Sequence, residues 1–153
     1  MSSDIHRITS RIDSLVISSE NIEDDEIKSH ISRYLCVLIS GFLEEVIKIL
    51  IYEYSSTHAN RSISNHVNYR CKKISNMNTK KILDLLATFD ELWKESLEFD
   101  LSDEEKDSID SVVANRNLIA HGKDTNISFV RVKGWWSVIK KVITKLGSVQ
   151  NCV

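Results

Sequence analysis

The chain contains no proline and only four glycines among its 153 residues, and this shortage constrains its fold more than any other feature. Proline and glycine provide the backbone angles of tight turns, and both interrupt regular structure. A sequence almost without them has little turn chemistry for a strand-rich fold, whereas its many Leu, Lys and Glu residues favour helices. We therefore predict an all-α fold. With 42% hydrophobic residues, the chain suits one domain, residues 1–153, around a single core.

Apolar residues at helical spacing predict where the helices lie. A first helix is expected near Ser3 to Ser19, and the acidic run Glu23–Glu26 opens a long second helix that could extend to about Tyr54. The polar segment from Asn60 to Asn78 is expected to be a partly helical connection. Further helices are predicted at about 79–99, 102–121 and 130–146, so the domain has about five or six helices, with its core at about 24–147.

The spacing also predicts which side chains of the later helices are buried. Trp136 is in register with the apolar residues of the last helix and is expected in the core, whereas Trp135 is the better candidate for an interface. In the helix expected at 79–99, the side chains predicted to face the core are Ile82, Leu85, Leu86, Phe89, Leu92 and Trp93.

The most informative stretch is residues 116–122, Arg-Asn-Leu-Ile-Ala-His-Gly. The helix that contains it begins with a Ser-x-x-Glu capping box at residues 102–105, and the glycine that closes the stretch is a stop signal. On a helical wheel, Arg116 falls near the middle of an apolar arc, and Asn117 and His121 lie one turn apart beside it. An arginine in that position is costly unless it is paired or faces water. We therefore expect this helix face to line a cleft or an interface.

A carboxylate of the long second helix is the expected partner of Arg116. On the wheel, Glu45 falls inside the apolar stripe of that helix, whereas Glu44 points away, so we favour Glu45 and keep Glu44 as the second supporting candidate. Such a pair would satisfy two buried charges and hold the guanidinium in a fixed direction. The alternative is an ion pair that only fixes the register of the two helices.

The pattern Arg-Asn-x-x-Ala-His-Gly resembles the Arg-x4-6-His motif of HEPN domains, including the polar residue directly after the arginine. Residues 42–48 of the long helix are similar to the RiboL-PSP-type HEPN branch, and residues 127–129 leading into 135–140 resemble its closing helix. The resemblance covers most of the chain from about Glu26 onward. It implies an up-and-down helical bundle.

The same resemblance implies a homodimer in which the motif helices bring two Arg/His sets into one cleft, and a metal-independent endoribonuclease. RNA carries its own nucleophile, because a deprotonated 2′-hydroxyl can attack the adjacent phosphate. His121 would act as acid or base, Arg116 would stabilise charge on the phosphoryl oxygens, and Asn117 would orient His121 or the phosphate. The resemblance also suggests a toxin or antiviral defence effector with an inhibitory or activating protein partner.

Two other functions remain open. Many members of the superfamily lack cleavage activity, so the chain could be a non-catalytic module for dimerisation or for binding RNA or protein. Arg116 would then pair with Glu45 only to stabilise the fold, and Asn117 and His121 would only form the end of the helix. The third interpretation is a regulatory subunit whose acidic surface docks a larger enzyme. Loss of cleavage in His121→Ala would distinguish the enzyme from the non-catalytic module, and co-purification of a stoichiometric partner would favour the regulatory subunit.

Positive charge is concentrated in two segments. Residues 61–81 carry six Lys or Arg and no acid, and residues 128–153 carry five and no acid. Together they could form a groove for a polyanion, although solvated helix faces give the same composition. Basic and aromatic side chains of the first segment suit contact with single-stranded RNA. The candidate RNA-binding residues are Arg61, His66, Tyr69, Arg70, Lys72 and Lys73.

Other classes of site lack their sequence patterns. The histidines and the three scattered cysteines have no ligand spacing, so we predict no metal site and no cofactor. The dispersed glycines form no phosphate-binding loop, which argues against ATP or dinucleotide binding by that route. Because neither a signal pattern nor an apolar run of roughly 18 residues occurs, we expect a soluble, cytoplasmic protein without a membrane partner.

Overall fold

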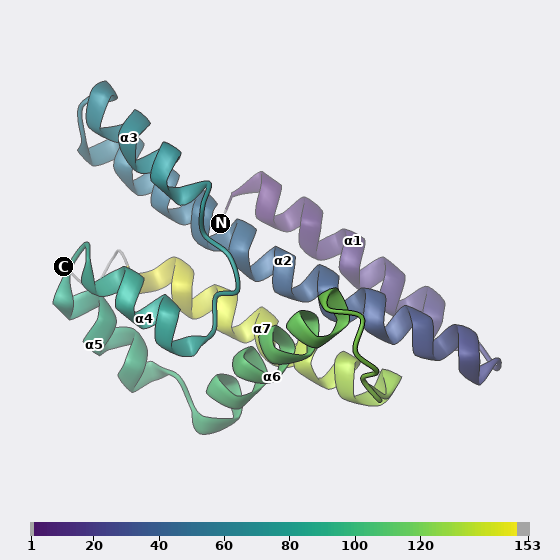
Figure 1. The fold of residues 1–153 in the computed structure, drawn as a ribbon. Helices are drawn as coiled ribbons and strands as arrows, with labels where there is room; N and C mark the ends of the chain where they lie inside the picture. The colour runs from purple at the N-terminus through teal and green to yellow at the C-terminus, as the bar shows by residue number, and fades with distance from the viewer. Residues whose placement is uncertain (1, 150–153) are drawn as a thin grey trace.

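The computed structural model describes residues 2–149, which form seven α-helices and no strand (Figure 1). The all-α prediction is confirmed, and the helix count is slightly above the expected five or six. No helix in this part of the chain is long and apolar enough to cross a membrane. In chain order the helices are α1 (Ser3–Ser19), α2 (Asp25–His58), α3 (Arg61–Cys71), α4 (Thr79–Ala87), α5 (Glu91–Asp100), α6 (Asp103–Ala120) and α7 (Phe129–Ser148).

Helix α2 is the spine of the bundle, because α1, α3, α6 and α7 all pack against its 34 residues (Figure 1). Asp24 caps its start, where the side-chain carboxylate accepts a hydrogen bond from the backbone N–H of Ile27 at 2.9 Å. Along α2, apolar side chains meet those of α6 and α7 in one core. The side chains of this core without exposed surface include Leu35, Ile39, Leu43, Val46, Ile109, Val112, Val132 and Ile139.

The carboxylate of Asp13 ties helix α1 to α7. Asp13 accepts a hydrogen bond from Trp136 Nε1 at 2.7 Å and another from Lys140 Nζ at 2.8 Å. Trp136 is buried, which confirms its predicted place in the core. Trp135 is buried as well, and the guanidinium of Arg131 lies 5.5 Å from its ring centroid. An interface role for Trp135 stays a prediction.

The additional helix arises from a break at residues 88–90. The sequence predicts one helix over about 79–99, but α4 ends at Ala87 and α5 begins at Glu91. Asp90 has an extended backbone with φ −158°, and its carboxylate accepts a hydrogen bond from the backbone N–H of Leu92 at 2.9 Å. This cap starts a new helix with a new direction. Leu92 is 56% exposed as a result, so its predicted position in the core is wrong, whereas Trp93 is buried as predicted.

Helix α3 and the C-terminal part of α2 form an arm that projects from the other helices (Figure 1). The segment from Asn60 to Asn78, expected to be partly helical, supplies α3 and the loop after it. Asn60 caps α3 by accepting a hydrogen bond from the backbone N–H of Ile63 at 3.0 Å. Residues 72–78 then lead back from the arm to α4, and this return path brings them to the candidate site.

Candidate functional site

The motif of residues 116–122 occupies the last turn and the end of α6, as the sequence predicts. Ser102 and Glu105 form the capping box at the start of the helix. At its end, Gly122 has φ +66°, its N–H donates to Ile119 O at 3.0 Å, and Lys123 N–H donates to Leu118 O at 3.0 Å. These two bonds are a Schellman motif, which needs a left-handed residue and therefore favours glycine. The predicted stop at Gly122 is confirmed.

Arg116 is half-buried, and neutral amides hold its guanidinium. Arg116 Nη1 donates a hydrogen bond to Asn76 Oδ1 at 2.9 Å and a longer one to Asn117 Oδ1 at 3.3 Å. Asn76 belongs to the loop between α3 and α4, and its own backbone N–H donates to Glu44 Oε1 at 2.6 Å. A hydrogen-bonded series thus runs from Glu44 on α2 through Asn76 to Arg116 and Asn117 on α6.

Glu45 does not take the place that the helical wheel gives it. Its side chain is 52% exposed, and its carboxylate lies 3.9 Å from Lys48 Nζ rather than against Arg116. Four helices pack on α2, so its buried arc is wide, and the stripe of Tyr34, Gly41, Glu45 and Tyr52 is exposed. The prediction that Glu45 is buried in the apolar stripe is therefore wrong. Glu44 is half-buried and reaches the site through Asn76.

Asn76 is the residue of this site that the sequence does not predict. Its φ of +54° lies in the left-handed region, which asparagine tolerates better than most residues with a side chain. The next residue, Met77, is buried in the core and anchors the loop. The only signal in the sequence is a polar, Asn-rich run before α4, and that run does not reveal a contact with a helix that lies 40 residues further along the chain.

His121 is the C-cap of α6 and is exposed. Its backbone N–H donates to Asn117 O at 3.1 Å, but within residues 2–149 its ring has no hydrogen-bond partner. Five residues separate it from Arg116, so the two side chains leave the helix about 140° apart and about 7.5 Å apart along the axis. Asn117 lies one turn before His121 on nearly the same face. The ring is free to meet a ligand or another chain.

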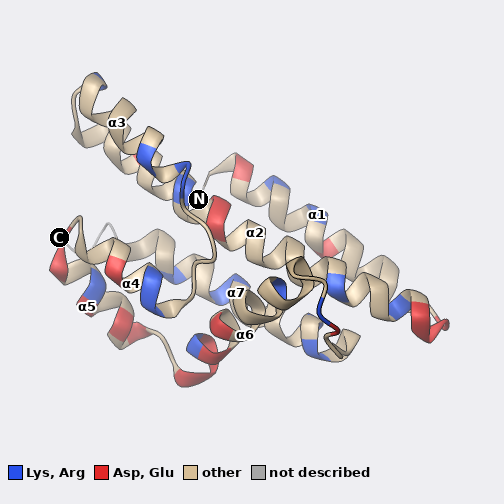
Figure 2. Cartoon of the chain, viewed as in Figure 1, with Lys and Arg blue, Asp and Glu red and all other residues tan. Residues whose placement is uncertain are grey.

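Charge along α6 is divided between its two ends. The first part of the helix is rich in Asp and Glu, whereas Arg116 is the only charged residue of α6 after Asp110 (Figure 2). None of the described ion pairs includes Arg116. Within residues 2–149 the guanidinium donates hydrogen bonds to amide oxygens and forms no ion pair, so no described carboxylate neutralises its charge by contact. This end of α6 is suited to an anionic ligand.

The six candidate RNA-binding residues are all exposed and lie on α3 or in the turn after it. Lys73 Nζ lies 5.5 Å from the centroid of the Tyr69 ring. Of the six, Lys72 and Lys73 are nearest along the chain to Asn76, which contacts Arg116. Arg61 lies at the other end of α3, about 15 Å from them along the helix axis. The structure therefore brings only part of the set toward Arg116.

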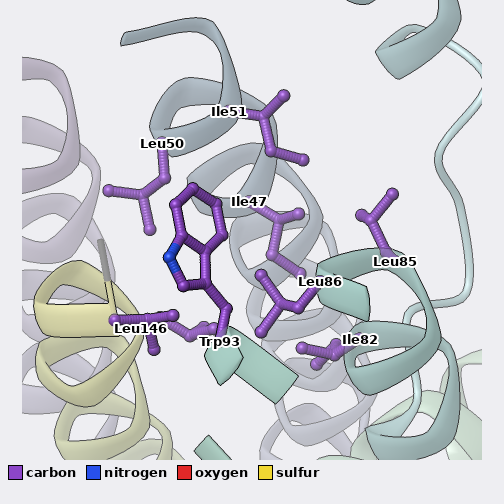
Figure 3. Close-up of a pocket in the computed structure, with 9 residues that line it drawn as sticks. Ile47, Leu50, Ile51, Ile82, Leu85, Leu86, Trp93 and Leu146 are labelled. Carbon is purple, nitrogen blue, oxygen red and sulfur yellow. The ribbon is translucent and has the colours of Figure 1, made fainter. Parts of the chain in front are cut away.

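Neither an enclosed cavity nor a cluster of metal ligands offers a competing site. A small cavity of about 20 Å³ lies between α2, α4, α5 and α7, and its lining is almost entirely apolar (Figure 3). No residue of the motif lines it. Residues 2–149 contain no group of three or more His, Cys, Asp or Glu side chains that could hold a metal ion.

The thiol of Cys36, which packs against α6, is unreactive in this structure. Cys36 of α2 is buried, and its Sγ lies 3.5 Å from the backbone oxygen of Val112 on α6. Burial raises the pKa of Cys36 to about 11, although a hydrogen bond with the backbone of Arg116 opposes the shift. A thiol with such a pKa stays protonated near neutral pH and is a poor nucleophile. Cys36 therefore acts as a packing residue between α2 and α6.

Comparison with known proteins agrees with the motif and the helical fold. The sequence matches the family described as RiboL-PSP-HEPN over residues 3–149. The match includes α1, so it begins before Glu26, where the resemblance of the sequence motifs begins. No curated protein and no solved structure matches the chain significantly. Because the match covers nearly the whole chain, and the Arg-x4-His motif lies at the end of its penultimate helix, the chain belongs to the RiboL-PSP-HEPN family.

Proposed function

We propose that this protein is a metal-independent endoribonuclease whose active site is built on Arg116, Asn117 and His121. The observation that carries the proposal is the half-buried guanidinium of Arg116, held at 2.9 Å by the neutral oxygen of Asn76 and close to the exposed His121. A positive charge fixed in direction and not neutralised by a carboxylate suits the stabilisation of a phosphoryl group.

The proposed reaction is attack of the RNA 2′-oxygen on the adjacent phosphorus. A base removes the 2′ proton, the new O–P bond forms, and the bond from phosphorus to the 5′-oxygen breaks while an acid protonates that oxygen. The products are a 2′,3′-cyclic phosphate and a 5′-hydroxyl. Histidine suits both proton transfers near neutral pH. Arg116 would stabilise the charge that builds up on the non-bridging oxygens, and Asn117 would orient Arg116, His121 or the phosphate.

We further propose that the active form is a homodimer. Arg116 and His121 leave α6 about 140° apart, so one chain alone presents them in different directions. The exposed surface beside His121 includes Ala114 and Leu118, which offer an apolar patch for a second copy of α6. In the dimer, His121 of one chain would act as the base and His121 of the other chain as the acid.

The competing function is a non-catalytic module for dimerisation or for binding RNA or protein. One observation favours it: the contact between Arg116 and Asn76 ties the α3–α4 loop to α6, and this is a structural role in its own right. A role as a toxin or defence effector under a protein partner rests on the family resemblance alone.

The test is incubation of single-stranded RNA with purified protein in excess EDTA. The enzyme proposal expects fragments from the wild type and from His6→Ala, a matched control on the exposed face of α1, but none from His121→Ala or Arg116→Ala. RNA binding without fragments from the wild type would instead favour the non-catalytic module.

A further inference from the structure

A second arginine lies near the end of α6 and lacks a good partner. Arg33 of α2 has a side chain that is only 34% exposed, and its Nη2 is 3.7 Å from Oδ1 of Asp124, whose side chain is fully exposed. Arg33 Nε is buried and has no hydrogen-bond acceptor within residues 2–149. An ion pair with so exposed a carboxylate contributes little, and a buried donor without an acceptor is costly. The Arg33 guanidinium is therefore poorly satisfied.

Arg33 lies on the part of α2 against which the C-terminal half of α6 packs. One turn further along α2, Cys36 Sγ is 3.5 Å from the backbone oxygen of Val112 on α6. The partner carboxylate, Asp124, comes three residues after His121, in the loop between α6 and α7 that lies beside α2 in Figure 1. Arg33 thus contacts the loop that directly follows the motif, three residues after His121.

The edge of α2 between Arg33 and the Arg116 site includes two small residues and is bordered by the exposed side chains of Tyr34 and Glu45. Eleven residues, or about 16 Å along the axis, separate Arg33 from Glu44, which supports Asn76 and through it Arg116. At helical spacing between them are Val37, which is 36% exposed, and Gly41, around which a Cβ would meet nothing within 4 Å. At these two positions no long side chain would obstruct a polynucleotide.

We propose that Arg33 binds a backbone phosphate of RNA within a few nucleotides of the scissile one and exchanges Asp124 for it. This inference rests on the proposed function, because it gives the same site a second phosphate contact. A phosphate offers two oxygens that match the planar guanidinium, whereas the exposed Asp124 carboxylate approaches only Nη2, at 3.7 Å. Asp124 acts as a competitor that occupies Arg33 when RNA is absent.

The test measures binding of 2′-O-methyl RNA, which lacks the nucleophilic hydroxyl, by fluorescence anisotropy over a range of salt concentrations. The variants are Arg33→Gln and Asp124→Asn. Their matched controls are Arg7→Gln and Asp4→Asn, from the exposed 3.1 Å ion pair on α1, which lies on the other side of α2 from α6 (Figure 1). Urea denaturation checks that Arg33→Gln remains folded.

We expect Arg33→Gln to bind about tenfold more weakly than Arg7→Gln. The slope of log affinity against log salt concentration should be smaller in magnitude by about 0.7, which is the value for one phosphate contact with a single strand. Asp124→Asn should bind more tightly than Asp4→Asn, because it frees Arg33. A merely structural ion pair would not give these opposite effects. Equal affinities and slopes for Arg33→Gln and Arg7→Gln, or no binding by the wild type, would overturn the inference.

The two proposals fail separately. If Arg33→Gln lowers affinity and slope as expected but the wild type leaves ordinary RNA intact in EDTA, the phosphate contact stands and the ribonuclease does not. If the wild type cleaves RNA while Arg33→Gln binds like its control, the ribonuclease stands and Arg33 has no part in it.

Discussion

At the scale of single residues, the site depends on how Arg116 is held. Asn76 Oδ1 accepts its hydrogen bond at 2.9 Å, and the carboxylate of Glu44 holds the backbone of Asn76 at 2.6 Å without contacting the guanidinium. Direct contact with a carboxylate would neutralise much of the charge that a phosphate needs. An intervening asparagine fixes the direction of the guanidinium and keeps its charge available.

Asn76→Gly tests this arrangement with little disturbance of the backbone. Glycine adopts the φ of +54° at no steric cost, so the loop should keep its path while Arg116 loses its acceptor. We expect kcat/KM for RNA cleavage to fall about tenfold, as for the loss of about 1.4 kcal/mol of positioning, with a small change in melting temperature. Asn21→Gly, at an exposed turn, is the control. Unchanged kcat/KM in Asn76→Gly would exclude a positioning role for Asn76.

The motif residues could be predicted from the sequence, but their partners could not. Arg116 and His121 are close in the chain, and helix geometry alone relates them. The choice between Glu44 and Glu45 depends on which side of α2 its neighbours leave open, and four helices decide that. Asn76 reaches Arg116 only because a loop returns from the arm of α3, and no local pattern encodes that path.

At the scale of helices, the two ends of α6 follow local rules that the sequence displays. The capping box at Ser102 and Glu105 and the glycine after His121 are short-range patterns, and both occur as predicted. The break between α4 and α5 was harder to predict, because apolar spacing continues through residues 88–90. There the Asp90 cap overrides the spacing and turns Leu92 outward.

Gly122→Ala tests whether the Schellman end positions His121. Alanine at φ +66° should lower the free energy of unfolding by about 1 kcal/mol. The cleavage rate should fall by more than this loss of stability explains, because the helix end shifts. Gly134→Ala is the matched control, since its Cβ would meet nothing within 4 Å inside α7, and it should stabilise the protein by about 0.5 to 1 kcal/mol. Urea denaturation and RNA cleavage measure the two effects. Equal stability of both variants would contradict this account of the helix end.

Glu105 links the start of α6 to α7 and makes stability depend on pH. Burial alone would raise its pKa, but hydrogen bonds from Lys145 Nζ at 2.6 Å and from the Ser102 N–H at 2.8 Å lower the pKa below its usual 4.5. Because the pKa of Glu105 is lower in the folded protein than in the unfolded chain, its contribution to stability is fully present above pH 4.5. That contribution is lost as the pH falls through the folded-state pKa. Urea denaturation at several acidic pH values should show a smaller loss in Glu105→Gln than in the wild type. Parallel curves of unfolding free energy against pH for Glu105→Gln and the wild type would contradict this role of Glu105.

At the scale of the whole molecule, the proposed site requires two chains. Arg116 and His121 point about 140° apart around α6, and the exposed ring of His121 has no partner within the described part of its own chain. The order of helices and the single core could be predicted, because they depend on apolar spacing along one chain. Which surface meets a second copy depends on shape complementarity, which a single sequence does not encode.

Mixing subunits tests whether both His121 side chains serve one cleft. If wild type and His121→Ala are refolded together in equal amounts, random pairing makes about one quarter of the dimers fully wild type. We expect the activity to fall to about one quarter of that of the same total amount of wild-type protein, because a mixed dimer lacks either its acid or its base. Activity of about one half would mean that each chain works alone.

The central claim is that the end of α6 carries out transesterification with the 2′-hydroxyl of RNA as the nucleophile. The measurement that tests it most directly is mass spectrometry of the fragments that the wild type produces from a defined single-stranded RNA in EDTA. We predict 2′,3′-cyclic phosphate ends paired with 5′-hydroxyl ends, and no cleavage where a 2′-O-methyl group replaces the attacking hydroxyl. Fragments with 5′-phosphate ends, or cleavage at a 2′-O-methyl nucleotide, would contradict the mechanism.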